Sequence, residues 1–258
     1  PAVSPARLRG AVTFADDLLA ITTERLAGWW AEQPTPPPEA EPADFGLDGE
    51  ACQEDPGAVI YRLAVAAALQ FRLDRSPAAV RAAYEHLAAS GALEALYEGT
   101  VPEDTTSLGD AQALMLASLV ARRLAEHPDL THDLERSRDA EAAFAVLEQA
   151  LGRGLFGVEL FWMMGGLARL GVLPKAGLEA YRAVPDRGVR DTLFRLGALA
   201  LPYAGDAAGL AQAAAAAHHV APGAPRPDVL LRAFAAAAGC AYGCPHRRRC
   251  DLPCRERA

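Results

Sequence analysis

Apolar residues recur at helical spacing along most of the chain. Phe144, Leu147 and Leu151, for example, lie at positions i, i+3 and i+7, which places them on one face of a helix. Ser76 followed by Pro77 is typical of a helix start, because the serine side chain caps the helix and proline fits its first position. The pattern predicts helices at 5–30, 58–73, 77–90, 92–97, 108–126, 139–151, 155–170, 175–184, 187–201, 206–218 and 228–238.

Two of these helices carry further signals. Ser107 and Asp110 have the spacing of a capping box, which predicts a helix that begins at residue 108. The stretch 155–170 is apolar on nearly every side, which is typical of a helix enclosed in a core. We therefore expect 155–170 to be the central helix of the fold.

The composition favours an all-α protein. Hydrophobic residues make up 51% of the chain and aromatic residues only 7%, and alanine, the strongest helix former, is very abundant. Runs rich in β-branched residues are few, and no fixed repeat with recurring signature positions is present. We expect either an irregular helical bundle or an array of helical hairpins, with a metal-binding tail at its C-terminal end.

The chain divides into four predicted segments. Residues 1–31 form an N-terminal helix, 58–238 the main α-helical domain and 239–258 the tail. Between them, 32–57 contains six prolines and eight acidic residues but no Lys or Arg. The charge of this segment therefore equals the net charge of the whole chain, −8. We expect such a segment to form no helix and to have little to bury, which predicts an extended linker or a loop wrapped over the surface.

Four of the five cysteines lie in the tail, with the spacing C-x3-C-x5-C-x3-C. Thiolates are soft ligands that suit zinc and iron–sulfur clusters. Residues four apart on a helical turn have Cβ atoms about 5–6 Å apart, which favours the larger cluster over a single zinc ion. We predict a [4Fe–4S] cluster, with Zn²⁺ as the alternative and disulfides or free thiols as a third. The predicted ligands are Cys240, Cys244, Cys250 and Cys254.

The tail is basic although the chain is acidic. From residue 246 onward it carries five arginines against Asp251 and Glu256. The planar guanidinium bonds two phosphate oxygens at once, so Arg247, Arg248 and Arg249 predict binding to nucleic acid or another polyanion. The endonuclease III family of DNA glycosylases also ends an all-helical chain with a basic four-cysteine loop. Its spacing is C-x6-C-x2-C-x5-C, so the resemblance is one of placement only.

Two other classes of function are compatible with the sequence. In the first, the chain is a helical scaffold that binds a protein partner through the acidic segment and the Trp29–Trp30 pair. Structural zinc in the tail then stabilises the end of this scaffold. In the second, the chain is an enzyme with a pocket between the Glu159 helix and the segment Arg187–Arg195. Glu159 either reaches the surface, meets an arginine or occupies that pocket.

Arginines cluster near that segment as well, at positions 182, 187, 190 and 195. Arg187, Arg190 and Arg195 partly share a helical face, which predicts either an anion site or an ordinary solvated surface. Cys52 stands alone, and we assign it no catalytic role. No nucleotide-binding loop or hydrolase motif is present, so the sequence leaves open whether the chain is an enzyme.

The sequence predicts no membrane partner. The longest apolar run, 155–167, contains Glu159 and is shorter than the roughly 20 residues that span a bilayer. The first predicted helix carries Asp16 and Asp17, unlike the apolar region of a secretory signal. We expect a soluble, cytoplasmic protein.

Overall fold

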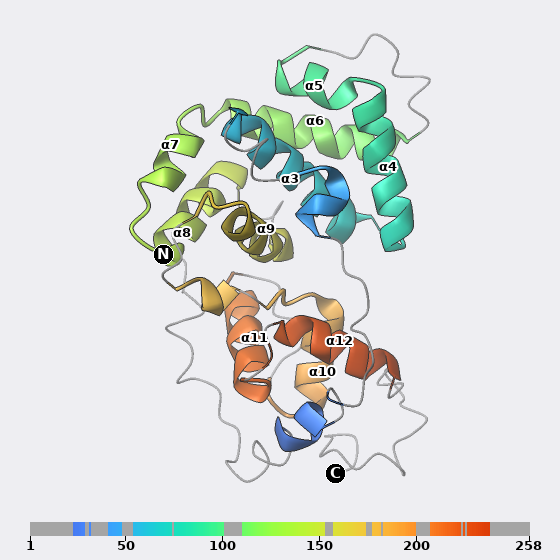
Figure 1. Ribbon diagram of the computed structural model, residues 1–258, viewed down its shortest axis with the longest axis vertical. Helices are drawn as coiled ribbons and strands as arrows, with labels where there is room; N and C mark the ends of the chain where they lie inside the picture. Colours follow the sequence, from blue (N-terminus) through green and yellow to red (C-terminus); the bar gives the residue numbers. More distant parts are fainter. Residues whose placement is uncertain are drawn as a thin grey trace. The chain divides into compact units, whose positions relative to one another are not determined.

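The fold is known from a computed structural model that describes residues 23–28, 31, 41–47, 54–73, 75–100, 110–152, 157–173, 177–181, 183–199, 207–222, 224 and 226–237. Every regular element in these ranges is a helix, as predicted (Figure 1). The chain forms two compact units. The central unit is Glu39–Leu178, and the terminal unit combines Pro1–Pro38 with Glu179–Ala258, so the predicted 58–238 domain has residues in both.

The central unit contains one 3-10 helix and seven α-helices in its described part. They are η1 (Pro42–Phe45), α3 (Pro56–Arg72), α4 (Pro77–Ala89), α5 (Ala92–Tyr97), α6 (Ala111–Ala125), α7 (Leu130–Glu135), α8 (Ala140–Leu151) and α9 (Val158–Arg169). The terminal unit includes helical residues 23–28 and the helices α10 (Arg187–Arg195), α11 (Ala207–Val220) and α12 (Pro227–Ala237). The 3-10 helix η2 (Leu178–Tyr181) begins at the last residue of the central unit.

Short polar side chains determine where several helices begin. Asp55, Ser76, Asp110, Asp139 and Asp186 each accept a hydrogen bond from the backbone N–H three residues later, over 2.8–3.3 Å. The helix predicted at 108–126 therefore begins only at residue 111, because Asp110 is its cap and not part of its first turn. The predicted starts at 77 and 92 are confirmed.

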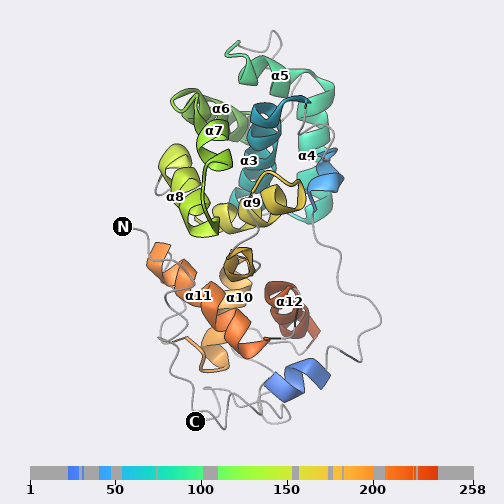
Figure 2. The same ribbon diagram turned by 60° about the vertical axis from the view of Figure 1, so that its left-hand side comes forward.

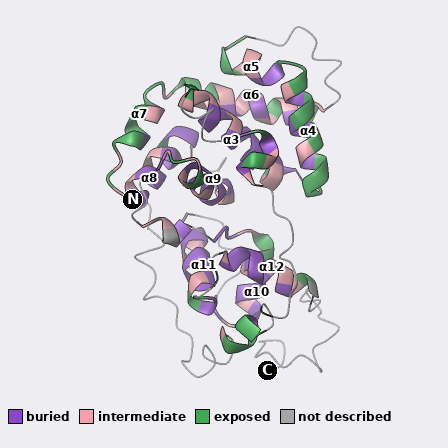
Figure 3. Ribbon diagram, viewed as in Figure 1, coloured by how far each residue is buried: buried purple, intermediate pink, exposed green. Residues whose placement is uncertain are grey.

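Helix α3 is the most enclosed element of the central unit. It contacts α4, α5, α6, α7 and α9, and it runs between α4 on one side and α6 and α7 on the other (Figure 2). All residues from Val59 to Leu69 are buried except Arg62. Helix α9 is also buried over most of its length, as predicted for 155–170, and it packs against α3 and α8 (Figure 3).

A glycine allows α3 and α9 to approach each other. A Cβ atom at Gly166 would lie 3.0 and 3.1 Å from the two δ-methyl groups of Leu63 and 3.4 Å from Cγ of Pro42. Such contacts are shorter than packed carbon atoms accept without movement. Leu63 is fully buried. Helices α3 and α9 and the 3-10 helix η1 therefore meet at a point where a larger residue than glycine requires its neighbours to move.

The prediction that 32–57 forms no helix and has little to bury is wrong for residues 41–47. Pro42, Phe45 and Leu47 are buried, and the Phe45 ring makes edge-on contacts with Tyr84 and Trp162 at centroid distances of 5.0 and 6.1 Å. The acidic residues are also engaged, since Glu41 pairs with Arg169 at 2.9 Å and Asp44 with Arg81 at 3.1 Å. This part of the segment is packed because its few apolar residues fall close together.

Two other predicted helices were placed incorrectly. Of 175–184, only the four residues of η2 are helical among those described, and Gly177 adopts a left-handed φ of 80° that an α-helix excludes. The helix predicted at 187–201 ends at Arg195. Gly197, with φ of 81°, and Ala198 turn their N–H groups back onto Phe194 and Leu193, which closes the helix.

The terminal unit packs around small side chains. Helices α10, α11 and α12 contact one another, and most of the alanines of α11 are buried. The residues described at 23–28 are helical. Leu26 is almost fully buried there, and the Thr23 hydroxyl donates to the Val220 carbonyl at 3.0 Å. None of the described helices in either unit has the length and apolar character needed to cross a membrane.

We predict opposite effects for two neighbouring glycines of α9. In Gly165→Ala the new Cβ meets nothing within 4 Å, so the gain in helix propensity should raise the free energy of unfolding by up to about 1 kcal/mol. In Gly166→Ala the clash with Leu63 should outweigh that gain and lower the free energy of unfolding by about 1–2 kcal/mol. Urea denaturation with unchanged m-values measures both. Equal stability of the two variants would show that Leu63 yields, and would refute the tight contact.

Candidate functional site

Most of the residues that the sequence analysis singled out lie outside the described residues, including all the predicted metal ligands. They are Cys240, Cys244, Cys250, Cys254, Arg247, Arg248, Arg249, Cys52, Trp29 and Trp30, together with Arg182. These predictions remain predictions. Within the described part of the chain, no group of three or more His, Cys, Asp or Glu side chains could hold a metal ion.

Helix α12 leads toward the tail and ends three residues before Cys240. Its second residue, Asp228, has no exposed side-chain surface. The Asp228 carboxylate accepts hydrogen bonds from Nε and Nη2 of Arg226, at 3.1 and 2.9 Å, and from Nη2 of Arg232 at 2.8 Å. A buried carboxylate is tolerated because two guanidinium groups satisfy it. These hydrogen bonds lie within residues 226–232 and stabilise the first turns of α12.

Arg232 also reaches helix α10. Its Nη1 donates to Oδ2 of Asp186 at 2.5 Å, while Oδ1 of Asp186 accepts from the Val189 N–H at 2.8 Å. One guanidinium therefore joins two carboxylates, one at the start of each helix. We call Asp186, Arg226, Asp228 and Arg232 the carboxylate–arginine cluster. Sequence reasoning missed it, although Asp228 and Arg232 are four residues apart and Asp186 precedes a predicted helix, both of which are local signals.

Burial changes the acidity of the carboxylate–arginine cluster. It raises the pKa of Asp186 from 3.8 to about 6, and the negative charge of Asp228 acts in the same direction, whereas the Val189 N–H lowers this pKa. Burial also lowers the pKa of Arg232 to about 10. Because 6 lies below neutral pH and 10 lies above it, both groups are mostly charged at pH 7. The ion pair therefore persists under neutral conditions.

The three described arginines of α10 do not form one surface. The Arg187 side chain is 85% exposed and lies 3.8 Å from Asp191. Arg190 is half-buried, and its Nε donates to the Asp186 carbonyl at 3.4 Å. Arg195 is only 7% exposed, and its Nη1 is buried with no hydrogen-bond partner among the described residues. The predicted solvated face fits Arg187 but not Arg195.

The helix does not compensate the charge of Arg195. Arg195 lies in the last turn of α10, where the helix dipole stabilises a cation by about 0.3–1 kcal/mol and at most by about 2 kcal/mol. Removing a guanidinium from water costs several kcal/mol. The desolvation cost of Arg195 therefore exceeds the stabilisation by the helix dipole, and no described residue supplies a counter-charge.

Glu159 meets an arginine, which was one of the three environments considered for it. Its Oε1 accepts a hydrogen bond from Nε of Arg72, and its Oε2 accepts one from the Gly157 N–H at 2.8 Å. The carboxylate is buried at the start of α9 and links that helix to the end of α3. Glu159 belongs to the central unit and α10 to the terminal unit, so the enzyme pocket proposed between them remains a hypothesis.

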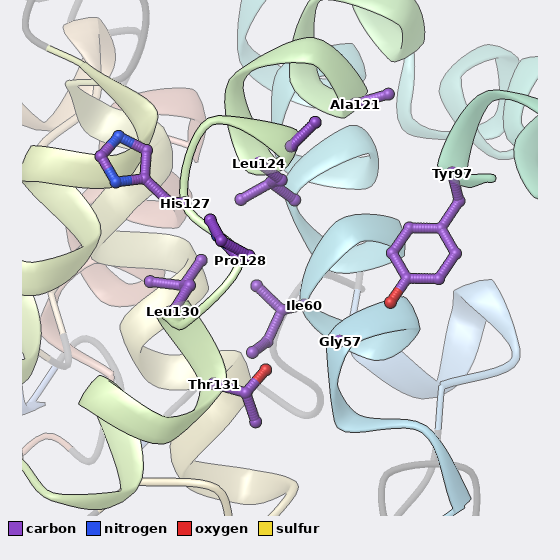
Figure 4. A pocket seen from close by; sticks show the side chains of 10 residues that line it. Gly57, Ile60, Tyr97, Ala121, Leu124, His127, Pro128, Leu130 and Thr131 are labelled. Atoms are coloured by element: carbon purple, nitrogen blue, oxygen red, sulfur yellow. The ribbon is translucent and has the colours of Figure 1, made fainter. Parts of the chain in front are cut away.

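The central unit has a small surface pocket of about 250 Å³ (Figure 4). It is lined by Gly57, Ile60, Tyr97, Ala121, Leu124, Ala125, His127, Pro128, Leu130 and Thr131. The Tyr97 hydroxyl points toward Gly57 and donates to Asp55 at 3.4 Å, while the His127 ring points away from Ile60 and Tyr97. Pockets for drug-sized ligands measure about 300–1,000 Å³. This pocket is smaller and mostly apolar, so we assign it no function.

The Tyr97 ring also stacks on Tyr61, with centroids 5.4 Å apart. Burial raises the pKa of Tyr61, so its phenol stays neutral at any physiological pH. This pair therefore has no titratable group available near neutral pH.

Comparison with known proteins adds no functional assignment. No protein-family model, no curated protein and no solved structure matches the chain.

We predict that Asp186→Asn changes how stability depends on pH. Asn keeps an oxygen that accepts the Val189 N–H but carries no charge. The pKa of Asp186 is higher in the folded state than its ordinary value of 3.8, so its stabilising contribution is fully present below about pH 4 and is lost as the pH rises through 6. Between pH 4 and pH 7, the free energy of unfolding of D186N should therefore rise relative to that of the wild type by about 1–3 kcal/mol.

Urea denaturation at several pH values measures this difference. Asp191→Asn is the matched control, because it removes an equal charge from the same helix without touching Arg232. The raised pKa would be contradicted if the difference in unfolding free energy between D186N and the wild type stayed constant with pH. It would also be contradicted if the wild type became relatively more stable as the pH rises.

Proposed function

We propose that the chain is a metal-binding α-helical protein whose four tail cysteines, Cys240, Cys244, Cys250 and Cys254, hold a [4Fe–4S] cluster, with Zn²⁺ as the alternative. The observation that carries this proposal is the C-x3-C-x5-C-x3-C spacing of four thiols within 15 residues. Further support comes from α12, which the carboxylate–arginine cluster fixes in the terminal unit three residues before Cys240. A ligand loop attached to a fixed helix loses less conformational entropy when metal binds.

We further propose that the metal holds the tail arginines against the phosphates of a nucleic acid. Arg247, Arg248 and Arg249 stand between the two cysteine pairs, so metal binding at both pairs would restrict the loop that carries them. The described side chains of the terminal unit add support, since they include six arginines against four carboxylates. A positive local field attracts phosphate even though the whole chain carries a charge of −8.

The metal proposal predicts that one cysteine variant loses metal and another does not. Protein purified without oxygen should contain about four irons and matching sulfide, or about one zinc. Cys240→Ser should reduce the bound metal at least severalfold, because a thiolate ligand is removed. Cys52→Ser changes the one cysteine outside the tail and should leave the metal content unchanged. Elemental analysis with a visible spectrum measures both. Equal metal content in the two variants would refute a four-cysteine site.

The nucleic-acid proposal predicts a change in salt dependence. Replacing Arg247, Arg248 and Arg249 with Ala should weaken binding to a mixed-sequence oligonucleotide. The slope of log affinity against log salt should become shallower by about 2 for single strands and about 3 for duplex, because three phosphate contacts are lost. Fluorescence anisotropy at several salt concentrations measures the slope.

The control variant replaces Arg122, Arg136 and Arg138, which are exposed on the central unit, and removes the same charge. Its salt slope should match that of the wild type. An unchanged slope in the tail variant, or no affinity for nucleic acid at all, would refute this proposal and favour the scaffold that binds a protein partner.

A further inference from the structure

Arg195 is a buried cation that the described structure leaves without a counter-charge. Its side chain takes part in no hydrogen bond or ion pair with a described residue, and its Nη1 is shielded from solvent. Arg187, on the same helix, is its contrast, since it is exposed and has Asp191 beside it. An anion or a set of hydrogen-bond acceptors stabilises a guanidinium that is shielded from solvent.

The nearby carboxylates are already engaged. Asp186 and Asp228 bind Arg232, and Asp191, four residues before Arg195, lies by Arg187 instead. The Thr192 hydroxyl, one turn before Arg195, donates to the Gly188 carbonyl at 2.8 Å. Among the described side chains of the terminal unit, arginines outnumber carboxylates by six to four. The described side chains of the terminal unit therefore carry a net positive charge.

We infer that Arg195 anchors a binding site for a small organic carboxylate. The guanidinium is planar and presents paired N–H donors that match the two oxygens of a carboxylate. A singly charged ligand balances one buried cation, whereas a phosphate dianion at the same place would leave an unbalanced negative charge. This site is independent of the tail and of nucleic-acid binding.

The test measures thermal stability while chloride is replaced by acetate at constant ionic strength. Acetate that binds only the folded protein raises the unfolding midpoint by about 2–8 °C at saturation, in a concentration-dependent manner that levels off. Arg195→Met should abolish this saturable rise. Arg195→Lys keeps the charge but lacks the planar fork, and should require severalfold more acetate. Arg187→Met removes an exposed arginine from the same helix and should respond as the wild type does.

Two further measurements separate the possible outcomes. Circular dichroism establishes that each variant is folded, and inorganic phosphate in place of acetate tests the preference for a single charge. A midpoint that rises equally in wild type and Arg195→Met is a general salt effect and would overturn the proposal. So would a wild type that does not respond to acetate while Arg195→Met is strongly destabilised, because Arg195 would then be completed from within the chain.

Discussion

The contact between Leu63 and the Cα of Gly166 determines how the central unit packs. It sets the separation of α3 and α9, and Pro42 reaches the same point from η1. Because these three elements converge there, Phe45 can extend over α4 and α9 to meet Tyr84 and Trp162. Packing at close range depends on small residues, and the many alanines of α3 let several other helices lie against it. The abundance of alanine is thus a requirement of the fold as well as a helix signal.

The terminal unit relies on a different constraint. Alanines dominate α11, and each buries little apolar area, whereas α12 buries Val229, Leu230, Leu231 and Phe234. The Arg232–Asp186 ion pair of the carboxylate–arginine cluster adds a polar link between α12 and α10. Buried ion pairs often add little net stability compared with apolar residues, but removing one partner typically costs about 3–5 kcal/mol. A shifted α12 would separate Arg232 from Asp186 at the start of α10, and that penalty disfavours alternative positions.

The sequence predicted helices best where two independent local signals coincide. Ser76 with Pro77 marks the start of α4, and the apolar stripe of Phe144, Leu147 and Leu151 places α8 within one residue of its observed start. Composition was misleading where it averages over a segment, since the charges of 32–57 concealed Phe45 and Leu47. Partners distant in sequence leave no local pattern. Arg72 and Glu159 are separated by 87 positions, and Arg232 and Asp186 by 46.

The same reasoning applies to the candidate sites. The four tail cysteines can be recognised because their spacing is local, but the choice between iron–sulfur cluster and zinc depends on distances between sulfurs, which spacing does not define. Arg195 could be recognised as a cation but not as a buried one, because its burial depends on helices far along the chain. Periodicity placed it beside Arg187, and packing separates the two.

The net charge of the chain is a poor guide to what it binds. Part of the acidic segment is engaged in structure, since Glu41 and Asp44 pair with Arg169 and Arg81 within the central unit. At physiological salt the field of an exposed charge extends only about 8 Å, so a partner meets the local surface and not the total. Salt then distinguishes the two proposed anion sites. Binding to exposed tail arginines releases counterions and weakens steeply with salt, whereas a buried guanidinium is screened much less. An anion whose affinity resists salt would therefore support the proposed site at Arg195, whatever the tail binds.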